Sequence, residues 1–145
     1  MDMKKSMVVV LLVFSVLILS SSALADEVQC GDTIRQDTVL KNDLLECGGG
    51  VALRISGDRI TLDCNGHAIE AARRGVGTGI KLTRFNSHAT IKNCRISRFF
   101  VNIELSNGAH DNLIKNNVLT WADAQGIAVY DADENNRIED NVLYR

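Results

Sequence analysis

Three aspartates in the C-terminal part of the chain have the side chain that acid–base chemistry needs. Asp123 precedes an alternating apolar segment, and Asp131 and Asp133 follow it within one turn. Two carboxylates are the minimum for acid–base cleavage of a glycosidic bond. Aspartate is also a common turn residue, because its side chain hydrogen-bonds to nearby backbone. The turn interpretation is the simpler one, since no catalytic motif surrounds the three residues.

Two histidines and an aspartate have side chains that bind divalent metals. His88 and His110 fall in the same turn of successive repeats, so we expect them to lie about 5–7 Å apart, with Asp111 beside them. Imidazole and carboxylate groups suit a divalent ion. All three methionines lie in the first 25 residues, which excludes a soft Cu(I) cluster in the rest of the chain. The alternative is that these are surface turn residues, and we predict no cofactor.

Two aromatic residues and two lysines are candidates for ligand binding. Trp121 and Tyr130 could stack on sugar rings, and Trp121 takes the position of Arg98 one repeat earlier, so we expect it outside. Packing against a neighbouring turn is the alternative for Trp121. Lys92 and Lys115 are candidates for contacts with an acidic glycan.

Basic residues cluster in the middle of the chain. The segment from Arg73 to Arg98 has basic side chains and no acid. Such a band could hold a polyanion, or the acids of neighbouring repeats could neutralise it. The net charge of −2 makes nucleic acid an improbable partner.

Repetition determines which structural elements position these residues. Ile91–Ile96 returns as Ile114–Leu119 and as Ile138–Leu143, with offsets of 23 and then 24 residues. Two independent series with one period indicate a stacked repeat. The second series consists of Ile80–Leu82, Ile103–Leu105 and Ile127–Val129.

Apolar residues alternate within each repeat, which is typical of strands. A repeat of about 23 residues is too short for a helix between parallel strands, so each strand must pair with its equivalent one coil on, ~4.8 Å away. The alignment predicts three inward columns: Leu53, Ile80, Ile103, Ile127; Leu62, Ile91, Ile114, Ile138; and Ile69, Ile96, Leu119, Leu143. Asn93, Asn116 and Asp140 are predicted to stack in a hydrogen-bonded column, with ordinary turn chemistry as the alternative.

The N-terminal segment has the features of a secretory signal peptide. Lys4 and Lys5 precede an apolar run, and Ala23-Leu24-Ala25 provides a cleavage site. The run is too short to span a bilayer, so we expect a membrane contact only before cleavage. Residues 26–145 are then one exported domain, secreted or periplasmic, with residues 26–50 as a cap or an irregular first coil.

All four cysteines lie in the predicted exported part. Cys30 and Cys47 bracket the first segment, and Cys64 and Cys94 fall one alignment position apart on neighbouring coils, so either pair could form a disulfide. Four cysteines allow three pairings, and the sequence does not choose among them. An enlarged turn is predicted between Glu70 and Thr78, where the spacing of equivalent residues exceeds the period.

Several motifs resemble the NosD-type right-handed parallel β-helix proteins, a group of carbohydrate-binding proteins and sugar hydrolases. The resemblance covers residues 30–143 and rests on Cys30–Ile34, Asp43–Cys47, Ile60–Ile69, Gly79-Ile80, Ile91–Cys94 and Gly126-Ile127. It implies an all-β, right-handed parallel β-helix, here of about five short coils. Some members of the group are periplasmic and linked to copper-enzyme maturation. Members usually have more coils, so we expect the C-terminal end to be uncapped and open to self-association or further coils.

The leading functional prediction is an exported, non-catalytic module that binds a polysaccharide. The alternatives are a fragment of a polysaccharide hydrolase or lyase and a NosD-like accessory protein with weak metal binding. Fold-level resemblance does not decide among the three.

Overall fold

The computed structural model describes residues 27–83, 86–131 and 135–145. The predicted signal peptide and Asp133 lie outside the described residues. The described chain contains strands and turns, and none of it forms a helix that could cross a membrane.

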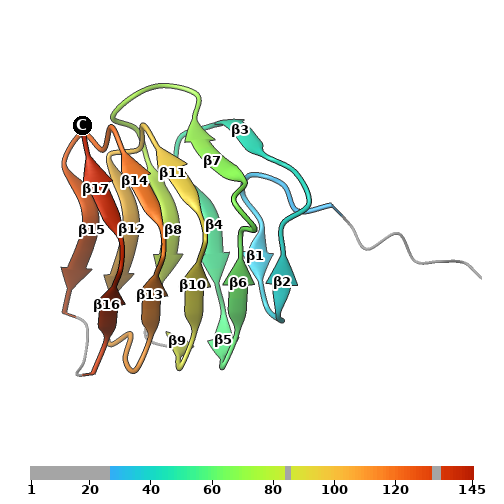
Figure 1. Ribbon diagram of the computed structural model, residues 1–145, viewed down its shortest axis with the longest axis vertical. Helices are drawn as coiled ribbons and strands as arrows, with labels where there is room; N and C mark the ends of the chain where they lie inside the picture. The colour runs from blue at the N-terminus through green and yellow to red at the C-terminus, as the bar shows by residue number, and fades with distance from the viewer. Residues whose placement is uncertain (1–26, 84–85, 132–134) are drawn as a thin grey trace, which may run out of the picture.

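Three five-stranded parallel sheets form the walls of a solenoid, in which each repeat makes one coil (Figure 1). Sheet A contains β1 (Thr33–Ile34), β4 (Val51–Ile55), β8 (Thr78–Leu82), β12 (Val101–Ser106) and β15 (Gln125–Tyr130). Sheet B contains β2 (Thr38–Val39), β6 (Thr61–Asp63), β10 (Thr90–Lys92), β13 (Leu113–Lys115) and β16 (Arg137–Glu139). Sheet C contains β3 (Leu44–Cys47), β7 (Ala68–Ala71), β11 (Arg95–Ser97), β14 (Val118–Thr120) and β17 (Val142–Tyr144). A small fourth sheet pairs β5 (Gly57–Asp58) with β9 (Asn86–Ser87).

The strand register confirms the predicted columns. In sheet A, Ile103 pairs with Ile80 on one side and with Ile127 on the other. The equivalent central pairings are Leu62–Ile91–Ile114–Ile138 in sheet B and Ile69–Ile96–Leu119–Leu143 in sheet C. Each coil therefore stacks on the one before it, as the period predicted.

The core is the space between the three sheets. Side chains of the inward columns are fully buried in the middle coils, and Phe99 lies among them. Burying one such side chain contributes ~1.5–3 kcal/mol. In the fifth coil the same columns end at Ile138 and Leu143, which are about half exposed.

The segment predicted as a cap or an irregular first coil forms β1, β2 and β3. These strands pair with the second coil, with a register shift between Leu44 and Cys47. Two disulfides are present, Cys30–Cys47 and Cys64–Cys94, with Cα–Cα distances of 5.4 and 4.7 Å. The first closes the N-terminal coil on itself, and the second joins two neighbouring coils.

The turn from sheet B to sheet C corrects one prediction. Asn93, Asn116 and Asp140 adopt positive φ angles of 56°, 54° and 51°, and among the described residues they form no ladder of their own. The ladder lies one residue later, where Asn117 is buried and its Oδ1 accepts a hydrogen bond from the Cys94 amide at 3.0 Å. The predicted column therefore provides the left-handed turn, which Asn and Asp tolerate well, and the next residue provides the hydrogen bonds.

A second ladder closes the turn from sheet A to sheet B. Asn112 Oδ1 accepts a hydrogen bond from the Ala89 amide, and Asn136 Oδ1 accepts one from the Asn112 amide. In both ladders, asparagine side chains provide hydrogen-bond acceptors for backbone amides in the turns, where strand pairing does not provide them.

The enlarged turn predicted between Glu70 and Thr78 follows β7. It arches across the edge at which sheet C passes into sheet A and reaches toward the later coils (Figure 1). The Gly75 amide donates to Arg98 O of the next coil at 2.9 Å, and a Cβ on Gly75 would lie 3.1 Å from Asp123 Cγ. Glycine suits this position because its φ is 76° and a Cβ would press against the Asp123 side chain. From β8 onward, paired residues of successive coils are 23 or 24 residues apart.

Candidate functional site

Most of the described aromatic side chains are on the surface. Phe99 is buried, whereas Phe100, Trp121, Tyr130 and Tyr144 are 45–58% exposed. Large aromatic side chains usually contribute to a core, so a set of them outside it indicates contact with a ligand or a partner. Three of the four lie at the edge between sheets C and A, which we call the C–A corner.

Backbone hydrogen bonds fix the three aromatic residues of the C–A corner in neighbouring coils. Phe100 O accepts a hydrogen bond from the Ala124 amide at 2.9 Å, and Tyr144 O accepts one from the Trp121 amide at 3.3 Å. Trp121 has a φ of 52°, as Arg98 has 69° at the equivalent position one coil earlier. Trp121 is therefore exposed at the position that the sequence predicted for it.

The enlarged turn adds charged groups to the same place. The Arg74 guanidinium carbon lies 5.7 Å from the centroid of the Trp121 ring, which is cation–π geometry. Arg74 Nε lies 3.7 Å from Asp123 Oδ1, and both side chains are half exposed. We call Arg74, Phe100, Trp121, Asp123 and Tyr144 the corner site.

A small hollow of about 180 Å³ adjoins the corner site. Tyr144 is the one corner-site residue among the described residues of its lining, which otherwise consists of Leu119, Ala122, Ala124, Gly126, Leu143 and Arg145. A larger hollow of about 690 Å³ lies beside the first coil, but the described residues that line it, between Glu27 and Asn42, include no aromatic side chain. The corner site thus combines exposed rings, paired charges and a hollow.

The predicted ligand-binding residues do not form one surface. Lys92 and Lys115 are paired neighbours on the outer face of sheet B. Trp121 is at the C–A corner, and Tyr130 is at the far end of β15, where its hydroxyl donates to Gln125 Oε1. Only Trp121 of the four belongs to the corner site.

The basic band is largely neutralised by neighbouring coils. Lys81 binds Glu104 at 2.7 Å, Lys92 binds Asp63 at 3.2 Å, and Arg98 binds Glu70 at 2.8 Å. Two interpretations of the band were open from the sequence, and these contacts support the neutralised one. Exposed pairs of this kind contribute only ~0–1 kcal/mol each.

The predicted catalytic carboxylates are also separated. Asp123 precedes β15 and Asp131 follows it, so a strand of six residues, ~20 Å long, lies between them. Paired glycosidase carboxylates lie ~5–9.5 Å apart. Asp123 and Asp131 therefore do not form such a pair, and Asp133 is outside the described residues.

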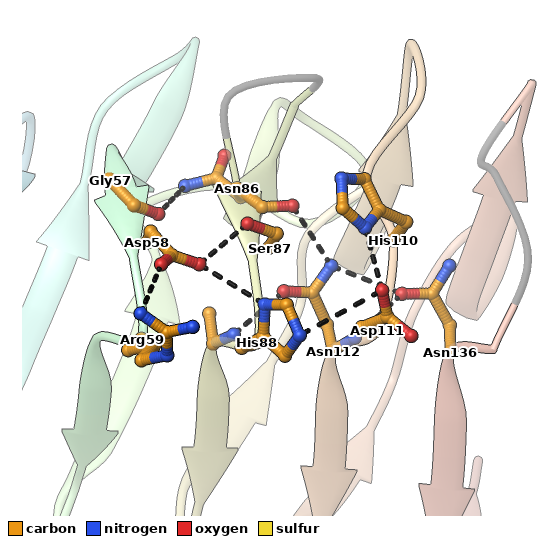
Figure 2. A network of polar contacts seen from close by, with 11 residues as sticks. Gly57, Asp58, Arg59, Asn86, Ser87, His88, His110, Asp111, Asn112 and Asn136 are labelled. Atoms are coloured by element: carbon orange, nitrogen blue, oxygen red, sulfur yellow. Dashed lines mark hydrogen bonds and ion pairs between the residues drawn. The ribbon is translucent and has the colours of Figure 1, made fainter.

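The predicted metal ligands do come together, at the corner between sheets A and B (Figure 2). The rings of His88 and His110 lie 6.2 Å apart, within the predicted range. Asp111 Oδ2 lies 2.8 Å from His110 Nδ1 and 3.9 Å from His88 Nε2. On its other side, His88 Nδ1 lies 3.1 Å from Asp58 Oδ1.

These four residues alternate carboxylate and imidazole groups over three coils, and we call them the His–Asp network. The pKa of the Asp58 carboxyl lies below its usual range. The main cause is a hydrogen bond from the Ser87 hydroxyl, and a hydrogen bond from His88 lowers the pKa further. His110 lowers the pKa of the Asp111 carboxyl in the same way. Among the described residues no group of three or more metal-binding side chains is arranged to hold an ion. The network's contacts run from Asp58 in the second coil to Asp111 in the fourth, so the network joins neighbouring coils.

Sequence reasoning missed most of the corner site. Phe99 and Phe100 are adjacent and identical in type, so no pattern says which one is buried. The sequence places Arg74 in the basic segment and in the enlarged turn, but it does not predict the contact with Trp121. The turn was a usable signal, because insertions in repeat proteins often build the binding face.

The fold and the corner site together define a β-solenoid with a fixed aromatic surface at one edge. The chain belongs to the right-handed β-helix region family, whose model matches residues 28–145. Neither the curated proteins nor the solved structures give a significant match to it.

Proposed function

We propose that this protein is a non-catalytic carbohydrate-binding β-helix and that the corner site is its contact surface. The observation that carries the proposal is the gathering of Phe100, Trp121 and Tyr144, all about half exposed, at a corner whose backbone is hydrogen-bonded from coil to coil. Rings held in this way bind without a large entropic cost of ordering, because little freedom is left to lose.

The chemistry of the corner site suits a sugar. Aromatic faces stack on the apolar C–H faces of sugar rings, which buries apolar area and leaves the hydroxyls free. Arg74 supplies donors and Asp123 supplies acceptors beside the Trp121 ring, and sugar hydroxyls pair with both. A few polar groups around an apolar surface are typical of small-molecule sites.

Charge favours a neutral glycan over an acidic one. Arg74 is balanced by Asp123, and the nearby Arg98 is balanced by Glu70. An acidic polysaccharide would have to compete with these carboxylates for the same cations. The proposed ligand is therefore a neutral polysaccharide.

The proposed setting is outside the cytosol. The two disulfides are typical of an oxidising compartment, and they agree with the signal peptide predicted from the sequence. The finer NosD-type assignment rests on the sequence motif of residues 60–69 and the segments around it.

The test uses the purified, disulfide-bonded protein on an array of neutral and acidic polysaccharides. We expect retention on one or more neutral glycans. Trp121→Asn should abolish it, and asparagine is chosen because it tolerates the left-handed turn at this position. Leu45→Ala, which changes an exposed apolar residue far from the corner, is the matched control.

Two results would contradict the proposal. The first is no retention on any glycan by protein that circular dichroism shows to be folded. The second is equal retention by Trp121→Asn and the native chain, which would place any binding elsewhere.

A further inference from the structure

The first half of the enlarged turn after β7 is exposed to solvent. Its residues Ala72, Arg73 and Arg74 are all exposed, and the two arginines are adjacent in the chain. The turn comprises residues 72–77, whereas the other connections from sheet C to sheet A are shorter, with residues 48–50, 98–100 and 121–124. Exposed loop tips are the preferred sites of proteolytic cleavage, because a protease must bind a stretch of accessible chain.

Contacts fix the second half of the same turn. The Gly75 amide donates to Arg98 O at 2.9 Å, and Val76 packs against the core. Among the described residues, Arg73 and Arg74 make no backbone hydrogen bond. The turn therefore has an anchored half and an open half, and the peptide bond between the two arginines lies in the open half.

The two arginines differ in what their side chains contact. Arg74 lies against the Trp121 ring, and its Nε is 3.7 Å from Asp123 Oδ1. Within the described chain, no ion pair, hydrogen bond or ring contact holds the Arg73 side chain. A carboxylate pairs well with a guanidinium group, so a protease with an acidic specificity pocket can bind Arg73 without displacing a partner.

We propose that the bond between Arg73 and Arg74 is a processing site for an arginine-specific protease. Hydrolysis adds one water molecule across this bond, so Arg73 gains a carboxylate and Arg74 gains an ammonium group, and no other bond changes. This proposal is independent of carbohydrate binding, because it rests only on the exposure and the contacts of the turn.

Other exposed arginines are poorer sites because of the residues that follow them. The Arg59 side chain is 76% exposed, but the next residue, Ile60, is buried, so cleavage there would require Ile60 to leave the core. The short turn at Arg35 is tied down by Asp37, whose Oδ1 accepts a hydrogen bond from the Thr61 amide at 2.8 Å. At the proposed site, exposed residues lie on both sides of the bond.

The cut protein should remain folded. Strands β4, β6 and β7 precede the cut, and they pair with β8, β10 and β11, which follow it. All three sheets therefore hold the two pieces together. The Cys64–Cys94 disulfide also joins them, because one cysteine lies on each side of the cut. The product is a folded protein of two disulfide-linked chains.

The test is limited proteolysis of the native, disulfide-bonded protein with trypsin. Mass spectrometry of the reduced products identifies the first cut, which should give one peptide that ends at Arg73 and one that begins at Arg74. The rate of cleavage follows the population of the opened segment, so this cut should be about tenfold faster than any other. Gel electrophoresis in SDS should show a single band of the original size until a reductant is added.

Variants then identify the arginine that the protease binds. Arg73→Gln should slow the first cut about tenfold, because the free guanidinium group is lost. Arg74→Gln should leave the cut after Arg73 in place. Arg59→Gln, which changes an arginine that is exposed but followed by a buried residue, is the matched control and should change nothing. Circular dichroism of each variant before digestion verifies the fold.

Several outcomes would overturn the proposal. A chain that trypsin leaves intact, or a first cut at any other bond between Cys30 and Arg145, would rule out the site. An undiminished rate in Arg73→Gln would rule out the role of this arginine. Loss of the strand signal in circular dichroism after the cut would rule out the folded two-chain product. None of these measurements involves a glycan, so a failure of the proposed function would not affect them.

Discussion

Arg74 lies with its guanidinium carbon 5.7 Å from the ring centroid of Trp121, although the two residues belong to turns two coils apart. The enlarged turn after β7 makes this contact possible, because it reaches past the intervening coil. Trp121 is the only tryptophan of the chain, so its fluorescence reports this one place.

Replacing Arg74 should expose the Trp121 ring. In Arg74→Gln the cation–π contact is lost, which at an exposed site contributes only ~0.5–1 kcal/mol, so the fold should persist. We expect a red-shifted emission and stronger quenching by acrylamide. Arg73→Gln, one residue earlier in the same turn, is the control, and an equal change in both variants would count against the contact.

The buried asparagine ladder should be costly to break. Asn117→Ala leaves the Cys94 amide and the Ile91 carbonyl without the partners they have in the native fold, so stability should fall by about 2–4 kcal/mol. Urea unfolding measures the change. Asn116→Gly is the matched control, because glycine accepts the positive φ of the adjacent position, and a similar loss in this variant would argue against the ladder.

A single methyl group should disturb the packing between β8 and its neighbours. A Cβ on Gly79 would lie 2.5 Å from Asn102 O and 2.7 Å from Ile96 Cγ2. Gly79→Ala should therefore cost about 1–3 kcal/mol through overpacking. Gly48→Ala meets nothing within 4 Å and should lower the thermal midpoint far less. Equal midpoints for the two variants would mean that β8 is not packed as described.

The disulfide between neighbouring coils should matter more than the N-terminal one. Cys64–Cys94 closes a loop with a sequence separation of 30, against 17 for Cys30–Cys47. Chain entropy predicts about 3–4 kcal/mol for each, with the larger value for the longer loop. Urea unfolding of the two double-alanine variants would test the order, and the reverse order would contradict it. The core position of Cys64 and Cys94 adds to the expected difference.

Acid should weaken the His–Asp network. The pKa values of Asp58 and Asp111 are lowered in the folded protein, so their contribution is complete above the ordinary carboxyl pKa of 3.8 and is lost as the pH falls through the lower folded value. Asp58→Asn should therefore lose less stability than the native protein between pH 5 and pH 2, measured by thermal unfolding. Asp140→Asn, outside the network, should keep the native pH dependence. A native-like acid response in Asp58→Asn would show that the network is not its source.

The fold was predictable because inward-facing residues at equivalent positions recur along the chain at a nearly constant sequence spacing. Ile91, Ile114 and Ile138 recur at a nearly constant spacing, and only a coil allows every member of such a series to lie over the preceding one. The exact residue of the ladder was not predictable. Both Asn116 and Asn117 are asparagines, and the choice between turn and ladder depends on a φ angle that the pattern does not contain.

The corner site was less predictable than the coil. Trp121 could be placed outside because Arg98 holds the equivalent position one coil earlier. His88 and His110 could be placed together because they fall in the same turn of successive coils. The contact between Arg74 and Trp121 depends on how far an irregular turn reaches, and a repeat pattern carries no information on that. The sequence already places Asp123 and Asp131 at opposite ends of one alternating segment, and the length of β15 keeps them apart.

The extra residues after β7 leave the pairing of Leu53 with Ile80 intact. Val76 of this turn packs against the core and anchors the turn, whereas Arg73 and Arg74 lie exposed on the surface. Side chains in the exposed part of such a turn can therefore differ without changing the stacking of the strands beneath it.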